Sequence, residues 1–337
     1  MPAPELSVAK IANGVEMAYL DSGPVPDSND FVTIVWVHGF LFNAYSIERL
    51  LPFAHQCNTR LIIVMRRDYP GSSRYTDEEM VLATENPELF FSRAGVLYLQ
   101  FMHHILKNTS VCKPTMDRSK GGICLAGWSL GNSFAMCALC ENEKAEPPTV
   151  ALGVRRSGEE NMYDPLRAKD GMENFRLWIT SYFNHPSPWD GTLTKLDQHG
   201  NSGRLPSIST WTDADIERWL SNSGLRSDSL VMLNDVSQSW LTKMSNEIFL
   251  GKPKVFPDLR IEYLCGSATC WYCVLPWDTF STKRAELSRK GEDTDLRRVK
   301  FTLIPGNNHF MHTDAPEDFM KIIKTSLEEQ SDAYTTL

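Results

Sequence analysis

The 337-residue chain lacks several features that mark other classes of protein. Its first five residues contain neither a basic stretch nor an apolar one, so they do not resemble a secretory signal. No apolar run approaches the ~20 residues of a membrane span. Acidic residues outnumber basic ones by 42 to 34, and the net charge of −8 argues against nucleic acid or an anionic membrane as a partner. We expect a cytoplasmic protein that binds neither; nothing in the sequence indicates an oligomeric state.

Cysteine is too sparse for a disulfide framework, with eight thiols in the whole chain. Two Cys-x-x-Cys pairs occur, Cys137/Cys140 and Cys270/Cys273. A zinc site made from both pairs needs all four thiols to converge, but the first pair falls in a helix that must pack inside the fold. The second pair has no thioredoxin-like surroundings that would indicate a redox role. We therefore expect neither a metal nor a cofactor.

Repeats and low-complexity tracts are also absent, and an apolar content of 42% with 23% charged residues is ordinary for a globular protein. Strand and helix signals alternate along most of the chain. This rhythm predicts a mostly parallel sheet with helices on both faces. Strands are expected near residues 8–11, 15–21, 31–37, 61–65, 123–126, 150–154, 260–265 and 299–304, and helices near 45–56, 87–107, 132–140 and 315–329.

The most informative segment is Gly127-Trp128-Ser129-Leu130-Gly131, between a predicted strand and a predicted helix. A Gly-x-Ser-x-Gly in this setting is the nucleophile-elbow pattern. The chain must reverse within about two residues, which strains the serine backbone and leaves room only for glycine on either side. The serine hydroxyl is thereby lifted to a helix N-terminus, where N–H groups stabilise negative charge. Ser129 is the candidate nucleophile.

A serine needs a base to accept its proton, and histidine suits that task near neutral pH. The predicted strand 299–304 runs into a loop that contains His309. The strand 31–37 likewise ends in His38-Gly39-Phe40. His309 could reach the elbow from the same edge of the sheet. His312 is the only rival as the base.

In these motifs and their order the chain resembles the α/β-hydrolase superfamily. The resemblance implies a doubly wound, mostly parallel eight-stranded sheet with an inserted helical cap. It also implies that Ser129 is the nucleophile, that His309 is the general base, and that the N–H groups of Phe40 and Leu130 form the oxyanion hole. The sequences of two segments are most similar to those of uncharacterised fungal members. These segments are Arg66-Arg67-Asp68-Tyr69-Pro70-Gly71-Ser72-Ser73 and Tyr182-Phe183-Asn184-His185.

The resemblance divides the chain into core residues 1–155, a helical cap at 156–254, and core residues 255–337. Five of the nine tryptophans fall in the cap range. Aromatic residues at helical spacing there first indicate a packing face. An aromatic roof over the sheet would also favour an apolar substrate. Trp128, Trp178 and Tyr182 are the candidate substrate-binding residues.

The position of the triad acid departs from the family pattern. In the family this acid usually comes three residues after the glycine that closes the seventh strand, and here Gly266 is followed at that distance by Thr269. A threonine can orient the histidine but cannot stabilise the imidazolium with a full charge. Three interpretations remain open: Asp278 is the acid, which is our tentative assignment; a carboxylate after the sixth strand (Glu159, Glu160 or Asp164) is; or no acid is present and hydrolysis is weak or lost.

Serine at the elbow narrows the chemistry, because epoxide hydrolases and haloalkane dehalogenases of this superfamily use an aspartate there. Acyl transfer through an acyl-enzyme on Ser129 fits best, as in a carboxylesterase or lactone hydrolase acting on a small to medium apolar substrate. Two alternatives stay open. One is hydrolysis of a carbon–carbon bond, and the other is a non-hydrolytic biosynthetic enzyme or ligand-binding protein with a relaxed triad.

Overall fold

A computed structural model describes residues 5–140, 165–166, 171–186, 189, 192–200, 202–329 and 335–336. The strand predicted at 150–154 and the carboxylates of Glu159, Glu160 and Asp164 lie outside these residues. None of the described helices is both long and apolar enough to cross a membrane.

The described strands form two sheets, and the strand expected at 150–154 in the eight-stranded sheet lies outside the described residues. The larger sheet has the order β1-β2-β4-β3-β5, and the smaller has the order β6-β7-β8. Only the pairs β1–β2 and β2–β4 are antiparallel, so the prediction of a mostly parallel arrangement is confirmed. The strands are β1 (Ser7–Lys10), β2 (Glu16–Asp21), β3 (Val32–Val37), β4 (Thr59–Val64), β5 (Ile123–Gly127), β6 (Ile261–Gly266), β7 (Val299–Ile304) and β8 (Thr335–Thr336).

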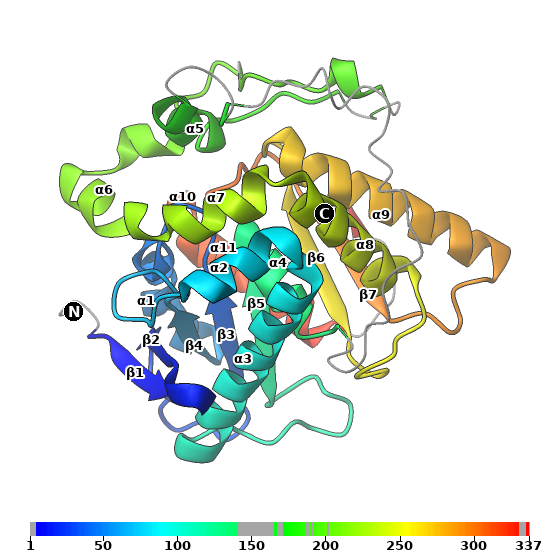
Figure 1. Cartoon of the computed structure of the whole chain (residues 1–337). Coiled ribbons are helices and arrows are strands. Elements are labelled where there is room, and N and C mark those ends of the chain that lie inside the picture. Colours follow the sequence, from blue (N-terminus) through cyan, green and yellow to red (C-terminus); the bar gives the residue numbers. More distant parts are fainter. Residues whose placement is uncertain are drawn as a thin grey trace.

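Helices cover both faces of the strands, as the alternating pattern predicted (Figure 1). On one side lie α2 (Asp77–Glu85), α3 (Pro87–Asn108), α4 (Leu130–Cys137), α8 (Asp235–Leu250) and α9 (Trp271–Lys290). On the other lie α1 (Leu51–Ala54), α10 (Met311–Asp314) and α11 (Pro316–Glu328). The helix expected at 45–56 is a series of short turns in which α1 is flanked by 3₁₀ segments, Ala44–Leu50 and His55–Cys57.

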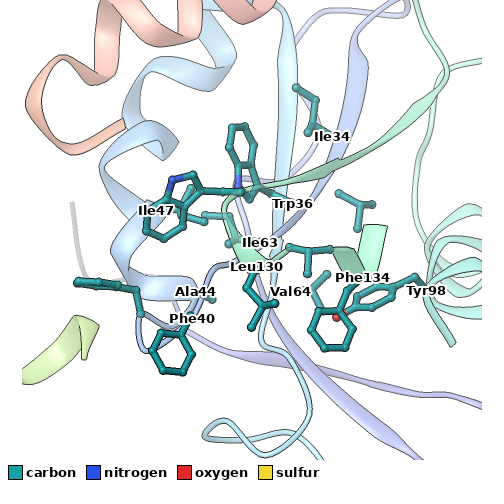
Figure 2. Close-up of a cluster of buried hydrophobic side chains, with 14 of the residues drawn as sticks. Ile34, Trp36, Phe40, Ala44, Ile47, Ile63, Val64, Tyr98, Leu130 and Phe134 are labelled. Carbon is teal, nitrogen blue, oxygen red and sulfur yellow. The ribbon is translucent and has the colours of Figure 1, made fainter. Parts of the chain in front are cut away.

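The core lies on both faces of the central strands, because β3 and β4 are almost fully buried and consist mainly of apolar, largely β-branched residues. Figure 2 shows Trp36 of β3 and Ile63 of β4 among side chains contributed by the surrounding helices and loops. On the α11 side the Trp36 ring meets Phe319 edge to face, with centroids 6.1 Å apart. The removal of these apolar side chains from water is the main force that holds the strands together.

Helices α5 (Gly171–Ile179), α6 (Asp213–Trp219) and α7 (Leu225–Leu233) lie beyond the carboxyl ends of the strands (Figure 1). We call the described residues between Gly171 and Leu233 the cap. Helix α8 falls in the range predicted for the cap, yet it packs against α3, α4 and α9 of the core. One example is Trp240, whose ring stacks on Phe91 of α3 at 4.8 Å.

The cap is hydrogen-bonded to the loop that follows β3. The N–H of Asn43 donates to the carbonyl of Trp219, and the N–H of Ser221 donates to the carbonyl of Leu41. An isolated β-bridge joins Phe42 to Leu220 between these two bonds. The predicted oxyanion loop is thus held from above by the cap.

Candidate active site

Ser129 occupies the turn between β5 and α4, as the elbow pattern predicted. Its backbone has φ 56° and ψ −128°, a strained conformation for a residue with a side chain. The glycines are required by close contacts. A Cβ on Gly131 would lie 2.2 Å from the carbonyl oxygen of Val37, and one on Gly127 would lie 2.6 Å from the backbone of Asn132. Strain at this position is typical of functional turns.

Two backbone N–H groups near Ser129 are available to an anion. Among the described residues, no acceptor takes a hydrogen bond from the N–H of Leu130 or from that of Phe40. Both residues line the same cavity as Ser129. Gly39 brings the two strand ends together, because a Cβ there would lie 2.9 Å from Ser129 Cβ. These are the two N–H groups that the resemblance assigned to the oxyanion hole, and that role stays a prediction.

A buried polar network fixes the loop that carries Phe40. The Arg66 guanidinium donates to the carbonyl of Gly39 and to both carboxylate oxygens of Asp228 in α7. The Tyr69 hydroxyl donates a hydrogen bond to Asp228, and its oxygen accepts one from the N–H of Leu41. Burial and the neighbouring carboxylate raise the pKa of Tyr69 well above its usual value, so the hydroxyl keeps its proton.

His38 is a structural member of the same network. Its Nδ1 lies 3.0 Å from the carbonyl of Gly39, to which it donates, and its Nε2 accepts from the N–H of Arg66. Burial lowers the pKa of His38 well below its usual value, and the positive charge of Arg66 acts in the same direction. The ring is therefore a neutral spacer between the two loops and has no free nitrogen for catalysis.

His309 lies in the same cavity as Ser129, on the loop between β7 and α10. Its backbone carbonyl accepts a hydrogen bond from Trp128 Nε1 at 3.0 Å, which ties the histidine loop directly to the elbow. The rings of Trp128 and His309 are 5.1 Å apart. His309 Nε2 is buried and has no hydrogen-bond partner among the described residues. The expected hydrogen bond to Ser129 is thus not formed here, although this nitrogen is unoccupied.

The other ring nitrogen of His309 faces a hydroxyl and a thiol. Nδ1 lies 3.4 Å from Thr269 Oγ1 and 3.5 Å from Cys273 Sγ. Thr269 is therefore beside the ring at the position where the family has its acid. Cys273 comes from the first turn of α9 and was not anticipated from the sequence.

Asp278, the tentative acid, does not occupy this position. It lies five residues after Cys273 on α9, which places it about 7.5 Å further along the helix axis and on a different face. The contact between Asp278 and Nδ1 that the sequence suggested is replaced by those of Thr269 and Cys273. Asp278 cannot reach Nδ1 because it lies at least two helical turns beyond Thr269, the usual position of the acid.

Cys270 completes the group around Nδ1. It is the N-cap residue of α9, and its Sγ lies 3.9 Å from that of Cys273. The hydrogen bond donated by Cys270 lowers the pKa of Cys273 well below its usual value. The ligand atoms of Cys270, Cys273 and His309 all lie within 4.8 Å of one another.

Of the predicted substrate-binding residues, Trp128 lines the cavity, whereas Trp178 and Tyr182 are engaged elsewhere. Trp178 Nε1 donates to the carbonyl of Gln198, and its ring packs on Phe183. The Tyr182 hydroxyl donates to Asp314 at 2.6 Å, and burial with this carboxylate raises its pKa to about 12. The aromatic stripe is thus mainly a packing face. The apolar residues that line this cavity include Phe40, Trp128, Phe175, Ile179, Tyr272 and Met311.

His312 is a poor rival to His309 as the base. Its ring lies edge to face against Trp128 with centroids 4.4 Å apart. Burial lowers its pKa to about 3, so the imidazole has little affinity for a proton. His309 remains the better candidate.

Similarity to known proteins is found in the structure and not in the sequence. No protein-family model and no curated protein matches the sequence. Solved structures do match along almost the whole chain. An epoxide hydrolase from an endophytic Streptomyces gives a TM-score of 0.56 at 13% identity, covering 100% of this chain and 98% of that one. The chain has the α/β-hydrolase fold.

Two further structures with the α/β-hydrolase fold agree. A mutant epoxide hydrolase from Solanum tuberosum gives a TM-score of 0.54 at 13% identity, covering 96% of this chain and 98% of that one. An epoxide hydrolase from Mycobacterium thermoresistibile gives 0.51 at 15% identity, covering 96% and 98%. The α/β-hydrolase fold accommodates many reactions, so at this level of identity the chemistry must be argued from the site itself.

Proposed function

We propose that the protein is a serine hydrolase that cleaves an ester or lactone of a small to medium apolar substrate. The observation that carries the proposal is the strained Ser129 turn, with unpaired N–H groups at Phe40 and Leu130 and the unpaired Nε2 of His309 in the same cavity. These are the nucleophile, the oxyanion donors and the base that acyl transfer requires. The aromatic and aliphatic lining favours an apolar acyl or alcohol group.

In the proposed reaction, Ser129 Oγ attacks the ester carbonyl while His309 Nε2 takes its proton. The N–H groups of Phe40 and Leu130 hold the oxyanion of the tetrahedral intermediate. The histidine then protonates the leaving alcohol, and an acyl-enzyme remains on Ser129. Water activated by the same nitrogen attacks this ester and regenerates the serine.

Thr269 and Cys273 take the orienting part of the acid's task. Either Oγ1 or Sγ can accept a hydrogen bond from Nδ1–H, which would leave Nε2 with its lone pair toward the serine. A hydroxyl does not supply the charge of a carboxylate. We therefore expect slower acyl transfer than in a triad with an aspartate.

The three solved structures compared above are epoxide hydrolases, and epoxide opening is the second candidate activity. Epoxide opening in this superfamily uses an aspartate that forms an alkyl ester at the elbow. Ser129 stands at that position, next to donors suited to an oxyanion. The elbow residue therefore favours ester cleavage.

A serine-directed fluorophosphonate tests the proposal. We expect the probe to label the native protein and not Ser129→Ala, and we expect the native protein to hydrolyse p-nitrophenyl acetate faster than styrene oxide. Absence of labelling in folded native protein would exclude an activated serine. Hydrolysis of styrene oxide alone would move the assignment to the second candidate.

A further inference from the structure

The geometry points to a zinc site made by Cys270, Cys273 and the Nδ1 of His309. The site shares His309 with the proposed hydrolase, so it concerns the regulation of that activity and rests in this respect on the proposed function. A bound Zn²⁺ would switch the base off. This departs from the expectation, drawn from the sequence, that the protein holds no metal.

The distances fit a tetrahedral ion. Zinc bound to thiolates at about 2.3 Å and to imidazole at about 2.0 Å sets its ligand atoms about 3.8 Å apart for S···S and about 3.5 Å apart for S···N. Cys270 Sγ and Cys273 Sγ are 3.9 Å apart, and Cys273 Sγ is 3.5 Å from His309 Nδ1. The remaining pair of atoms lies within 4.8 Å, so only a small side-chain rotation is needed.

The ligand types select the metal. Two thiolates and one imidazole are soft to intermediate donors, which suit Zn²⁺ rather than Mg²⁺ or Ca²⁺. The two thiols stand at the N-terminus of α9, where the helix dipole stabilises thiolate charge. The fourth position is open to Thr269 Oγ1, which lies 3.4 Å from Nδ1, or to water from the cavity.

The backbone around the third ligand is held in place. Asn308 donates from its buried amide to the carbonyl of Thr180 and accepts from the N–H of Phe310, while Trp128 holds the carbonyl of His309. The backbone that carries the histidine is therefore already fixed before a metal binds. Cys270, Cys273 and His309 are all among the residues that line the cavity.

Metal binding and base catalysis exclude each other at this ring. A nitrogen that binds zinc uses its lone pair, so a neutral imidazole bound through Nδ1 carries its proton on Nε2. Nε2–H cannot accept the proton of Ser129. Occupancy of the site is therefore expected to stop hydrolysis while it leaves the elbow and the oxyanion donors unchanged.

Cobalt substitution tests the site without reference to activity. The reduced, EDTA-treated protein is titrated with Co²⁺ under argon, and we expect one tetrahedral Co²⁺ with a thiolate-to-cobalt charge-transfer band that Zn²⁺ removes. Cys273→Ser and Cys270→Ser should each weaken binding by more than about 100-fold, since loss of a ligand exceeds the effect of its hydrogen-bond partners. The matched control is Cys112→Ser, a partly exposed thiol on another loop, which should bind like the native protein.

Several outcomes would overturn the site: no charge-transfer band in the reduced native protein, a band that survives in Cys273→Ser, or an equal loss in Cys112→Ser. Hydrolysis of p-nitrophenyl acetate is then compared with and without one equivalent of Zn²⁺ within each variant. Native protein that hydrolyses equally fast in both states would overturn the inhibition. Cobalt binding by native protein and by Ser129→Ala, with no hydrolysis by either, would leave the metal site standing and reject the proposed function.

Discussion

Arg66 of the core and Asp228 of the cap form a buried, bidentate ion pair next to the loop that carries Phe40. Their side chains are 3% and 1% exposed, with Nη1 to Oδ1 at 2.8 Å. The same guanidinium holds the carbonyl of Gly39. The ion pair therefore connects the cap to the loop that carries Phe40.

Asp228→Ala is expected to reduce the free energy of unfolding by about 3–5 kcal/mol, because it leaves the Arg66 charge buried without its partner. The measurement is urea denaturation followed by tryptophan fluorescence. Arg226→Ala is the matched control on the same helix. Its ion pair with Asp77 is largely exposed, so its loss should cost at most about 1 kcal/mol. Equal effects from the two variants would contradict the role given to Asp228.

Ser129→Ala and His309→Ala should each lower hydrolysis of p-nitrophenyl acetate by several orders of magnitude. The double variant should lose little more, since members of a catalytic unit act together. Thermal unfolding checks that each variant remains folded. His103→Ala, an exposed histidine on α3, serves as the control and should keep full activity. Near-normal turnover by either single variant would reject the assignment.

The sequence predicted the parts of the site that depend on short-range geometry. The glycines around Ser129 are required by contacts between neighbouring segments, and they appear in the sequence as a fixed spacing. His309 follows a strand end in the same way. Both could be placed because a strand followed by a turn determines where the next side chain lies.

The partners of those residues could not be predicted, because they arise from contacts between distant segments. Tyr182 looks like a pocket residue in the sequence, but its hydroxyl is taken by Asp314, which lies 132 residues away. Cys273 reaches His309 because Cys270, immediately after Thr269, is the N-cap residue of α9 and places Cys273 in its first turn. The Cys-x-x-Cys pair beside the acid position is the available signal in the sequence, but its spacing alone indicates a redox pair or half of a four-thiol site.

Gly39→Ala tests how closely the oxyanion loop approaches the nucleophile. The added Cβ would lie 2.9 Å from Ser129 Cβ and 3.1 Å from the Trp128 ring, so the serine must shift. A displacement of about 1 Å can cost about 100-fold in rate, and we expect turnover to fall by at least that factor. Asn132→Ala, an exposed position on α4, is the control and should be nearly neutral. An active Gly39→Ala protein would show that this approach is not critical.

The side chains that support His309 as the base can be distinguished by substitution. Thr269 Oγ1 and Cys273 Sγ face His309 Nδ1, whereas Asp278 lies further along α9, so Asp278→Asn should leave hydrolysis nearly unchanged and Thr269→Val should lower it. Thr269→Asp should raise it, because a carboxylate at this position stabilises the imidazolium that forms when Ser129 is deprotonated. The measurement is kcat for p-nitrophenyl acetate in metal-free buffer. A large loss in Asp278→Asn with no effect of Thr269→Val would mean that Asp278 rather than Thr269 supports the base during turnover.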